Sequence, residues 1–405
     1  MNRSQVPVHA AGRPGRGWRD FAATQWAREA VVVPDAPPLG IGPDDAHALL
    51  VAAAASRTAR PRLTTTDGQL REPGRLLPGP ADADLAGYAD RLAAEPRLAG
   101  DGWLLTVRDP FGDDFARWSR VRDVLAGLWR HIGRPALPVT AELAVGDRHH
   151  AADETTAPAD AAALTWVIDG SLTVRVRPEH TGTEYELQAR AGDLVHWPAG
   201  SRHLDHRAGR CTTLRLAVPA RATSALPLVA DIVTDQMRRH PRYANGQVVL
   251  PHPVPAAADG RLVPPSQLTR SADQFADTLA GSGPERALLL RWAGLRSAEG
   301  LDPAPPLRAG VRLTPHHRLL RTADIVRVGD TPDHAFWAAN GHTWPAPGAG
   351  ADRALAALRT ARDGLTVAEL ARACAVPADD TRLHALLGAA YRARAVAATA
   401  PERRP

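Results

Sequence analysis

The hydrophobic pattern is most regular near the middle of the chain, where short segments with strand-like periodicity follow one another. Residues 165–168 form a short apolar run that ends at Asp169-Gly170, a dipeptide typical of a tight hairpin turn. Apolar and polar residues alternate strictly over 172–177, as expected for a strand with one buried face. Further short strands follow, each bounded by Gly or Pro. The pattern predicts an antiparallel double sheet rather than strands alternating with helices.

Helical periodicity dominates on both sides of this segment. The predicted helices cover residues 21–30, 44–53, 82–94, 115–132, 226–239, 266–279 and 285–295. Beyond residue 310, short strands are joined by the hairpin signal Asn340-Gly341, and a helix begins at the capping box Thr366-x-x-Glu369. The order of a helix, a capped helix, a turn, another helix and a short strand is typical of a winged helix.

Composition narrows the classes of protein that fit. The 405 residues suffice for two or three domains, and no run approaches the ~20 apolar residues of a membrane-spanning helix. The N-terminus has no signal-peptide core, so we expect a cytoplasmic protein without membrane contacts. The two cysteines, Cys211 and Cys374, lie too far apart in sequence to suggest a Cys-x-x-Cys metal site. Net charge is +5 without blocks of like charge, which by itself leaves nucleic-acid binding open. The predicted helix at 383–392 has few side chains that could read bases, so nucleic acid is not the expected partner.

One segment resembles a known family. Residues 192–203 read GDLVHWPAGSRH and resemble the matching segment of bacterial JmjC-type cupins, the Fe(II)/2-oxoglutarate hydroxylases related to the ribosomal oxygenases. Residues 21–34 are similar to the start of the same proteins. The resemblance implies an α+β fold, namely a double-stranded β-helix (the cupin or JmjC jelly roll) with flanking helices and a C-terminal winged-helix domain.

The same resemblance implies a division of the chain into domains. The expected parts are a disordered N-terminus (1–20), a jelly-roll domain (21–220), a helical linker or dimerisation region (221–305) and a winged-helix-like domain (306–405). Because the helical region carries dimerisation in that family, the resemblance also implies a homodimer.

The resemblance further implies a metal site. A mononuclear iron oxygenase holds its metal with two histidines and one carboxylate. His203 stands at the position of the family's distal ligand. The family's His-x-Asp pair is incomplete here, because Asp160 can supply the carboxylate but Pro158 stands near the place of the histidine. His150, a few residues upstream, is the candidate for the missing ligand.

A co-substrate site is implied near the metal. Arg175 or Arg177 would hold the carboxylate of 2-oxoglutarate, with Thr165 assigned to the same site, because the planar guanidinium binds a carboxylate through two hydrogen bonds. Alternation alone does not decide whether these arginines face into the barrel or out of it.

Three functions remain open on the sequence. The first, which the resemblance favours, is a relative of the enzymes that hydroxylate a peptide or protein side chain with Fe(II) and 2-oxoglutarate. The second is a relative that has lost the metal and the cofactor and binds a peptide or protein partner. The third is a simpler cupin enzyme that uses another metal through His149, His150 and His203.

Overall fold

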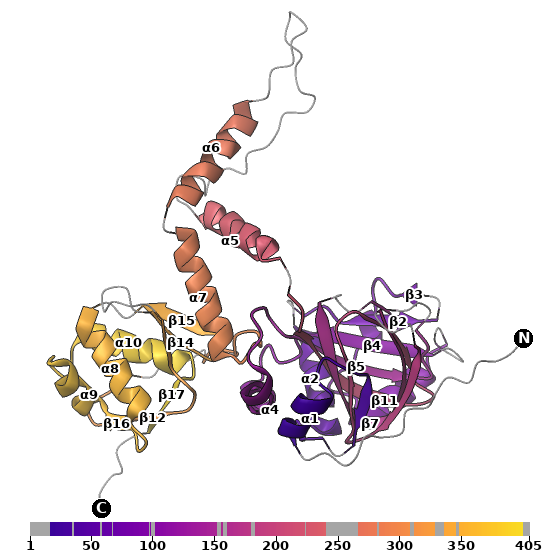
Figure 1. The fold of residues 1–405 in the computed structure, drawn as a ribbon. Coiled ribbons are helices and arrows are strands. Elements are labelled where there is room, and N and C mark those ends of the chain that lie inside the picture. Colours follow the sequence, from indigo (N-terminus) through magenta and orange to yellow (C-terminus); the bar gives the residue numbers. More distant parts are fainter. Residues whose placement is uncertain are drawn as a thin grey trace, which may run out of the picture.

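Two compact bodies and a helical arm make up the chain (Figure 1). The computed structural model describes residues 17–34, 36–56, 59–66, 68–96, 98, 102–151, 155–156, 160–179, 183–222, 224–239, 266–281, 283–307, 312–328, 336–345 and 348–399. In this part of the chain, no helix is long and apolar enough to cross a membrane.

The N-terminal body is built on antiparallel strands. Its larger sheet runs in the order β1 (Val31–Val33), β9 (Leu194–Trp197), β7 (Ala161–Pro178), β11 (Cys211–Pro219), β5 (Thr140–Asp147), β4 (Trp103–Arg108), β2 (Arg62–Thr65) and β3 (Gly68–Gln69). The second half of β7 pairs with β8 (Tyr185–Arg190) and β10 (Ser201–His206), and β10 also pairs with β6 (Thr155–Thr156). The strands predicted from alternation are thus present, and β7 belongs to both groups of strands.

The hairpin predicted at Asp169-Gly170 is wrong, because β7 continues through this dipeptide without reversing. Gly170 has φ +76°, and a Cβ placed there would lie 2.0 Å from the backbone oxygen of Arg210. The register with β11 also shifts between Thr212 and Thr213. The dipeptide therefore forms a bulge-like irregularity in which glycine permits a conformation and a close approach that other residues resist. There the chain leaves the larger sheet for the smaller group of strands.

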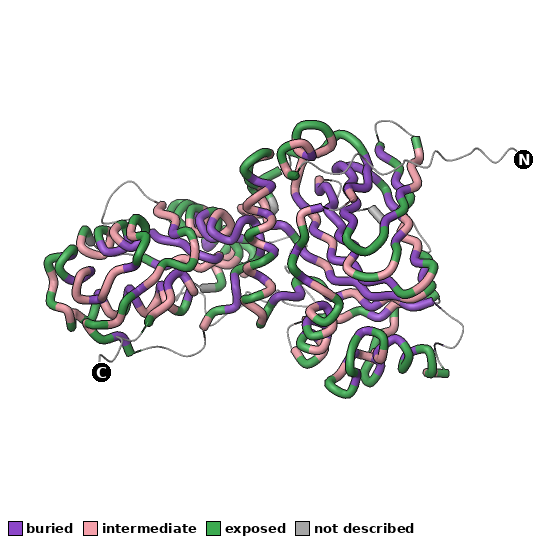
Figure 2. The backbone as a smooth tube through the Cα atoms, turned by 90° about the horizontal axis from the view of Figure 1, so that it is seen from below, coloured by how far each residue is buried: buried purple, intermediate pink, exposed green. Residues whose placement is uncertain are grey.

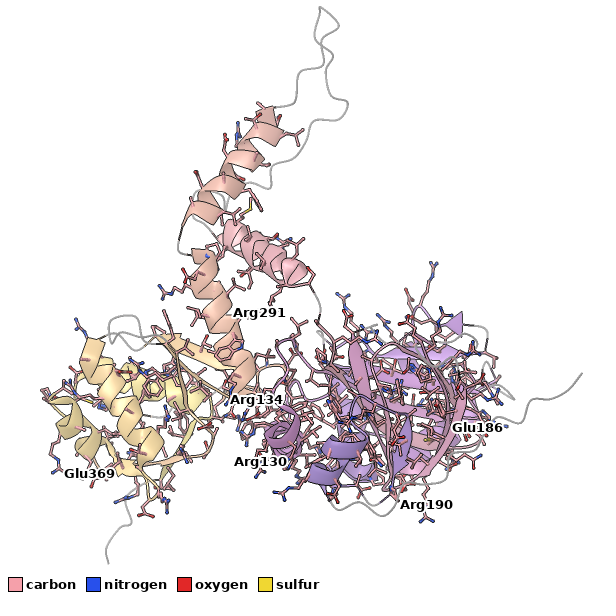
Figure 3. The ribbon with its side chains drawn as sticks, in the orientation of Figure 1. Arg130, Arg134, Glu186, Arg190, Arg291 and Glu369 are labelled. Carbon is pink, nitrogen blue, oxygen red and sulfur yellow. The ribbon has the colours of Figure 1, made fainter. Side chains whose placement is uncertain are left out.

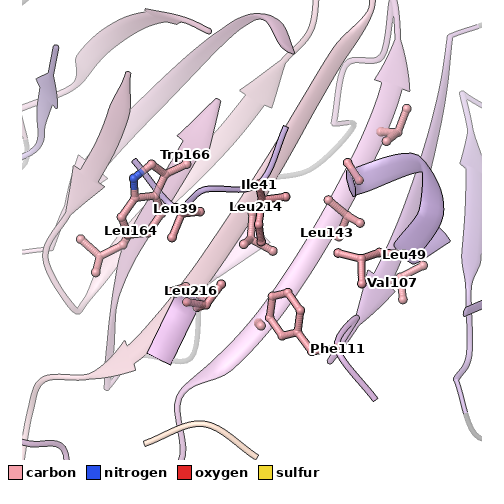
Figure 4. Packing of buried hydrophobic residues seen from close by; sticks show 14 of the residues in the cluster. Leu39, Ile41, Leu49, Val107, Phe111, Leu143, Leu164, Trp166, Leu214 and Leu216 are labelled. Atoms are coloured by element: carbon pink, nitrogen blue, oxygen red, sulfur yellow. The ribbon is translucent and has the colours of Figure 1, made fainter. Parts of the chain in front are cut away.

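One face of the larger sheet is covered by helices. These are α1 (Trp18–Thr24), α2 (Pro43–Ala55), α3 (Leu85–Ala93) and α4 (Phe115–Ile132). Figure 4 shows the core between them, where Leu143, Leu164, Trp166, Leu214 and Leu216 project from the strands. Because side chains alternate along a strand, the residues between these project to the other face, toward the smaller group of strands. We call the space between the two groups the interior.

The segment that follows α1 is fixed to the sheet through a fully buried histidine on β9. The ring of His196 stacks on Trp26 with a centroid distance of 5.2 Å. Its Nδ1 donates to the backbone oxygen of Ala163 at 2.8 Å, and its Nε2 accepts from the backbone nitrogen of Ala27 at 3.3 Å. Burial lowers the pKa of His196 to about 4, so the neutral ring that these two bonds require is maintained.

The C-terminal half begins with an arm of helices and ends in the second body. The arm contains α5 (Leu226–Arg239), α6 (Ser266–Ala280) and α7 (Gly283–Ser297). The second body contains β12 (Arg318–Arg321), β13 (Val326–Val328), β14 (Phe336–Ala339), β15 (His342–Pro345), α8 (Gly348–Thr360), β16 (Leu365–Thr366), α9 (Val367–Cys374), α10 (Thr381–Arg392) and β17 (Val396–Thr399). It has a hydrophobic core of its own, and Figure 2 shows buried residues concentrated along its inner segments.

Two local predictions for this body are confirmed. Asn340 and Gly341, with φ +50° and +87°, connect β14 to β15 as expected for this dipeptide. Thr366 and Glu369 form the predicted capping box at the start of α9. The two bodies meet at α4, where Arg122 Nη1 donates to Oδ1 of Asn340, in the turn between β14 and β15, at 2.6 Å.

Candidate functional site

His203 points into the interior from β10. A turn that contains Gly200 at φ +76° precedes the strand, and alternation then directs Ser201, His203 and Asp205 to the same face. Only 3% of His203 is exposed, and its ring lies against Trp197 with a centroid distance of 4.8 Å. His203 therefore lies buried between the two groups of strands.

A guanidinium from the opposite sheet meets His203. Arg215, on β11, lies with Nη1 3.1 Å from His203 Nε2. Its Nη2 donates to both carboxylate oxygens of Asp205, at 3.0 and 2.7 Å, and its Nε donates to the hydroxyl of Thr165 at 3.0 Å. The guanidinium carbon also stands 4.9 Å from the ring centroid of Trp197. Arg215 thus joins both sheets through the interior.

A second arginine approaches the same carboxylate. Arg207 is only 1% exposed, and its Nη2 lies 3.5 Å from Asp205 Oδ2 and 3.3 Å from the hydroxyl of Thr213. Its backbone nitrogen donates to the backbone oxygen of His149 at 2.9 Å, and His149 is itself buried. Among the residues that the structure describes, this network therefore joins two guanidinium groups to the carboxylate of Asp205.

The charges of this network govern its protonation. Burial alone would raise the pKa of Asp205, but the charges of Arg215 and Arg207 outweigh burial and hold that pKa far below its ordinary value. Burial, then the charge of Arg215, lowers the pKa of His203 to about 4. Burial, and to a smaller extent the charge of Arg207, likewise lowers the pKa of His149 to about 4. At neutral pH the carboxylate is ionised and both imidazoles are neutral.

The two arginines predicted to anchor 2-oxoglutarate lie elsewhere. Along β7 the residues at 172, 174 and 176 are buried, so Arg175 and Arg177 take the outward positions. Arg175 pairs with Glu186 at 3.3 Å and Arg177 with Glu184 at 3.0 Å, and the arginine side chains are 54% and 46% exposed. Figure 3 shows Glu186 at the outside of the body. These arginines do not reach the interior, whereas Thr165, assigned to the same site, does and bonds to Arg215.

The other predicted metal ligands do not gather around His203. His150 is exposed, and its ring lies against that of His206 with a centroid distance of 4.0 Å. Asp160 precedes β7, where its backbone oxygen accepts from the backbone nitrogen of Ala220 at 2.8 Å. Within the described ranges, no three His, Cys, Asp or Glu side chains are placed to hold a metal ion.

The residues that face the interior do not fit a mononuclear iron centre. A guanidinium can only donate, so the contact with Arg215 uses the Nε2 lone pair with which His203 would bind a metal. Asp205, the carboxylate on the same face of β10, is bound by two cations. A metal would have to displace Arg215 and then sit beside two positive charges.

Asp205, Arg207 and Arg215 were not predicted as site residues. A signal was present, because His203, Asp205 and Arg207 occur at every second position and therefore share one face of a strand. Polar residues at every second position usually predict the solvent-facing side of a strand. Here it faces inward, because oppositely charged partners from both sheets meet in the interior.

Comparison with known proteins supports the fold. No protein-family model matches the chain, and no curated protein does. A crystal structure of the Escherichia coli ribosomal oxygenase YcfD matches with a TM-score of 0.50 and 15% identity, over 96% of this chain and 100% of that one. The same protein in complex with cobalt and 2-oxoglutarate matches with a TM-score of 0.47 and 16% identity, over 95% and 98%. The resemblance to ribosomal oxygenases is confirmed at the level of the fold.

Proposed function

We propose that this chain is a jelly-roll protein of the ribosomal-oxygenase type that binds a peptide or protein partner and does not carry out Fe(II)/2-oxoglutarate hydroxylation. One observation carries the proposal. The imidazole that would bind the metal accepts a hydrogen bond from Arg215, and the nearest carboxylate, Asp205, is held by the same guanidinium. Peptide or protein binding is suggested by the fold shared with a ribosomal oxygenase.

Fe(II) and 2-oxoglutarate are the cofactors that the fold family implies. When bound in such a protein, they supply the oxidising chemistry for hydroxylation. The place predicted for the co-substrate carboxylate is on the outside of β7, and the inward arginines already bind Asp205. We therefore propose that both cofactors have been lost, and we derive no reaction step through them.

Co-substrate turnover tests this proposal. The purified full chain is loaded anaerobically with Fe(II), supplied with 2-oxoglutarate and oxygen, and assayed for succinate, with the E. coli ribosomal oxygenase treated in parallel as a positive control. We expect succinate at the level of a blank without protein. Enzyme-dependent succinate that disappears in His203→Ala would refute the proposal.

We further propose that the arm formed by α5, α6 and α7 is a homodimer interface. Within the described chain, the large apolar side chains that are most exposed all belong to this arm: Leu226, Leu268, Phe275, Leu279, Leu289 and Trp292. On α6, the residues at 268, 275 and 279 are spaced by seven and four positions, so they form one stripe along the helix. An exposed apolar stripe of this kind is typical of a surface that is covered by a partner.

Light scattering coupled to size-exclusion chromatography tests the interface. Phe275→Glu places a charge in the stripe and is expected to convert a dimer into a monomer. Arg270→Glu changes an exposed residue on the opposite side of the same helix and should leave the dimer intact. A wild-type chain that runs as a monomer at all concentrations would contradict the proposal.

The second body completes the proposed organisation. Its helices α8, α9 and α10 and its three-stranded sheet of β16, β12 and β17 support the assignment of a winged helix. We propose that residues 306–405 form this domain, after a jelly-roll domain at 21–220 and a helical region at 221–305, and that the domain contacts protein rather than nucleic acid.

A further inference from the structure

The interior contains several buried polar atoms that have no hydrogen-bond partner within the described chain. They include Nε1 of Trp197 and Nδ1 of both His203 and His149, together with Nε and Nη1 of Arg207, for whose guanidinium the buried thiol of Cys211 is only a weak acceptor. Buried polar groups in proteins are nearly always bonded to protein or to ordered water, so a concentration of unpaired ones in one region indicates that water or a ligand bonds to them. Arg207 has the greatest need of a further hydrogen-bond acceptor, because it is charged and only 1% exposed.

The unpaired atoms whose chemistry is fixed are all donors. The guanidinium nitrogens of Arg207 and the indole nitrogen of Trp197 can only donate. His203 accepts from Arg215 through Nε2, and a neutral ring with one accepting nitrogen carries its proton on the other, so Nδ1 is a donor too. A ligand for these groups must therefore be an acceptor.

The balance of charge points to the same ligand class. Two guanidinium groups share the carboxylate of Asp205, while the neighbouring imidazoles are neutral, so this cluster of described residues carries an excess of one positive charge, which favours an anion over water. From these observations we infer that the interior binds a small monovalent carboxylate, such as formate or acetate, through Arg207. Arg207, His203 and His149 are each at least 95% buried, so a carboxylate that is part of a peptide or protein would not reach them. The ligand is therefore a free small acid. The inference rests on the proposed metal-free interior.

Thermal unfolding with added formate tests the inference. The full chain is titrated in the presence of a chelator, with sodium chloride at equal ionic strength as the reference. We expect a saturable rise in Tm with formate beyond the effect of chloride, since a ligand that binds only the folded state stabilises it. In Arg207→Lys the charge remains but the planar donor pair is lost, so the apparent affinity should fall about tenfold.

Arg175→Lys is the matched control, because it makes the same change on the outer face of β7 and should bind formate like the wild type. Equal affinity in Arg207→Lys and the wild type would overturn the inference, as would a wild-type response no larger than that to chloride. If Arg207→Lys does not fold, the wild-type titration alone decides. Because a chelator is present, failure here leaves the metal-free proposal untouched, whereas that proposal fails on succinate production.

Discussion

The change Asp205→Asn isolates the electrostatic role of the interior network. The amide has nearly the same shape as the carboxylate, so the substitution removes a charge without opening a cavity. Arg215 and Arg207 would then face each other without a counter-charge, and both side chains are well shielded from water at 18% and 1% exposure. Removing one partner from a buried ion pair costs about 3–5 kcal/mol.

Glu186→Gln provides the matched control. It also converts a carboxylate into an amide in an ion pair, but its partner Arg175 is 54% exposed, and such surface pairs contribute only about 0–1 kcal/mol. Urea unfolding followed by circular dichroism gives the free energy of unfolding for both variants. A loss for Asp205→Asn that is no larger than the loss for Glu186→Gln would refute the reasoning that the interior depends on this carboxylate.

Two further predictions concern stability. Three histidines have a folded pKa near 4, namely His149, His196 and His203, whereas the unfolded chain binds a proton at each of them near pH 6.5. The free energy of unfolding should therefore fall as pH drops from 6.5 toward 4, by about 2 kcal/mol per histidine at pH 5. Urea midpoints that do not change over this range would contradict this prediction. Gly170→Ala should lower the free energy of unfolding by more than about 3 kcal/mol, because positive φ and a backbone oxygen 2.0 Å from the new carbon both oppose it. Gly192→Ala, with φ +93° but open space around it, should cost only about 1–2 kcal/mol, and equal losses would show that the close approach does not matter.

The strands of the fold were largely predictable, because a period of two residues sets which face of a strand is buried. The same rule did not reveal the path of the chain at Asp169-Gly170. That dipeptide favours a hairpin turn, but it suits equally a bulge in a continuous strand, and only the pairing of β7 with strands on both sides distinguishes the two. β4 was not anticipated, although Trp103, Leu105 and Val107 alternate, because it stands alone between predicted helices.

The candidate site was predictable only in part. The turn at Gly200 and the inward direction of His203 follow from local sequence. The partner of that histidine does not, since Arg215 comes from the opposite sheet and nothing in its own strand marks it as inward-facing. The facing of Arg175 was left open on the sequence. The structure places it outward, because the apolar residues at 172, 174 and 176 take the buried face of β7 and Arg175 pairs with Glu186.

Metal stoichiometry tests the central claim most directly. The full chain is incubated anaerobically with excess Fe(II), freed of unbound metal by gel filtration, and measured by elemental analysis beside His203→Ala. Since Arg215 uses the lone pair of His203 and shares Asp205 with Arg207, we expect no more iron in the wild type than in the variant. Iron bound in equal molar amount to the wild-type chain and absent from His203→Ala would contradict the account.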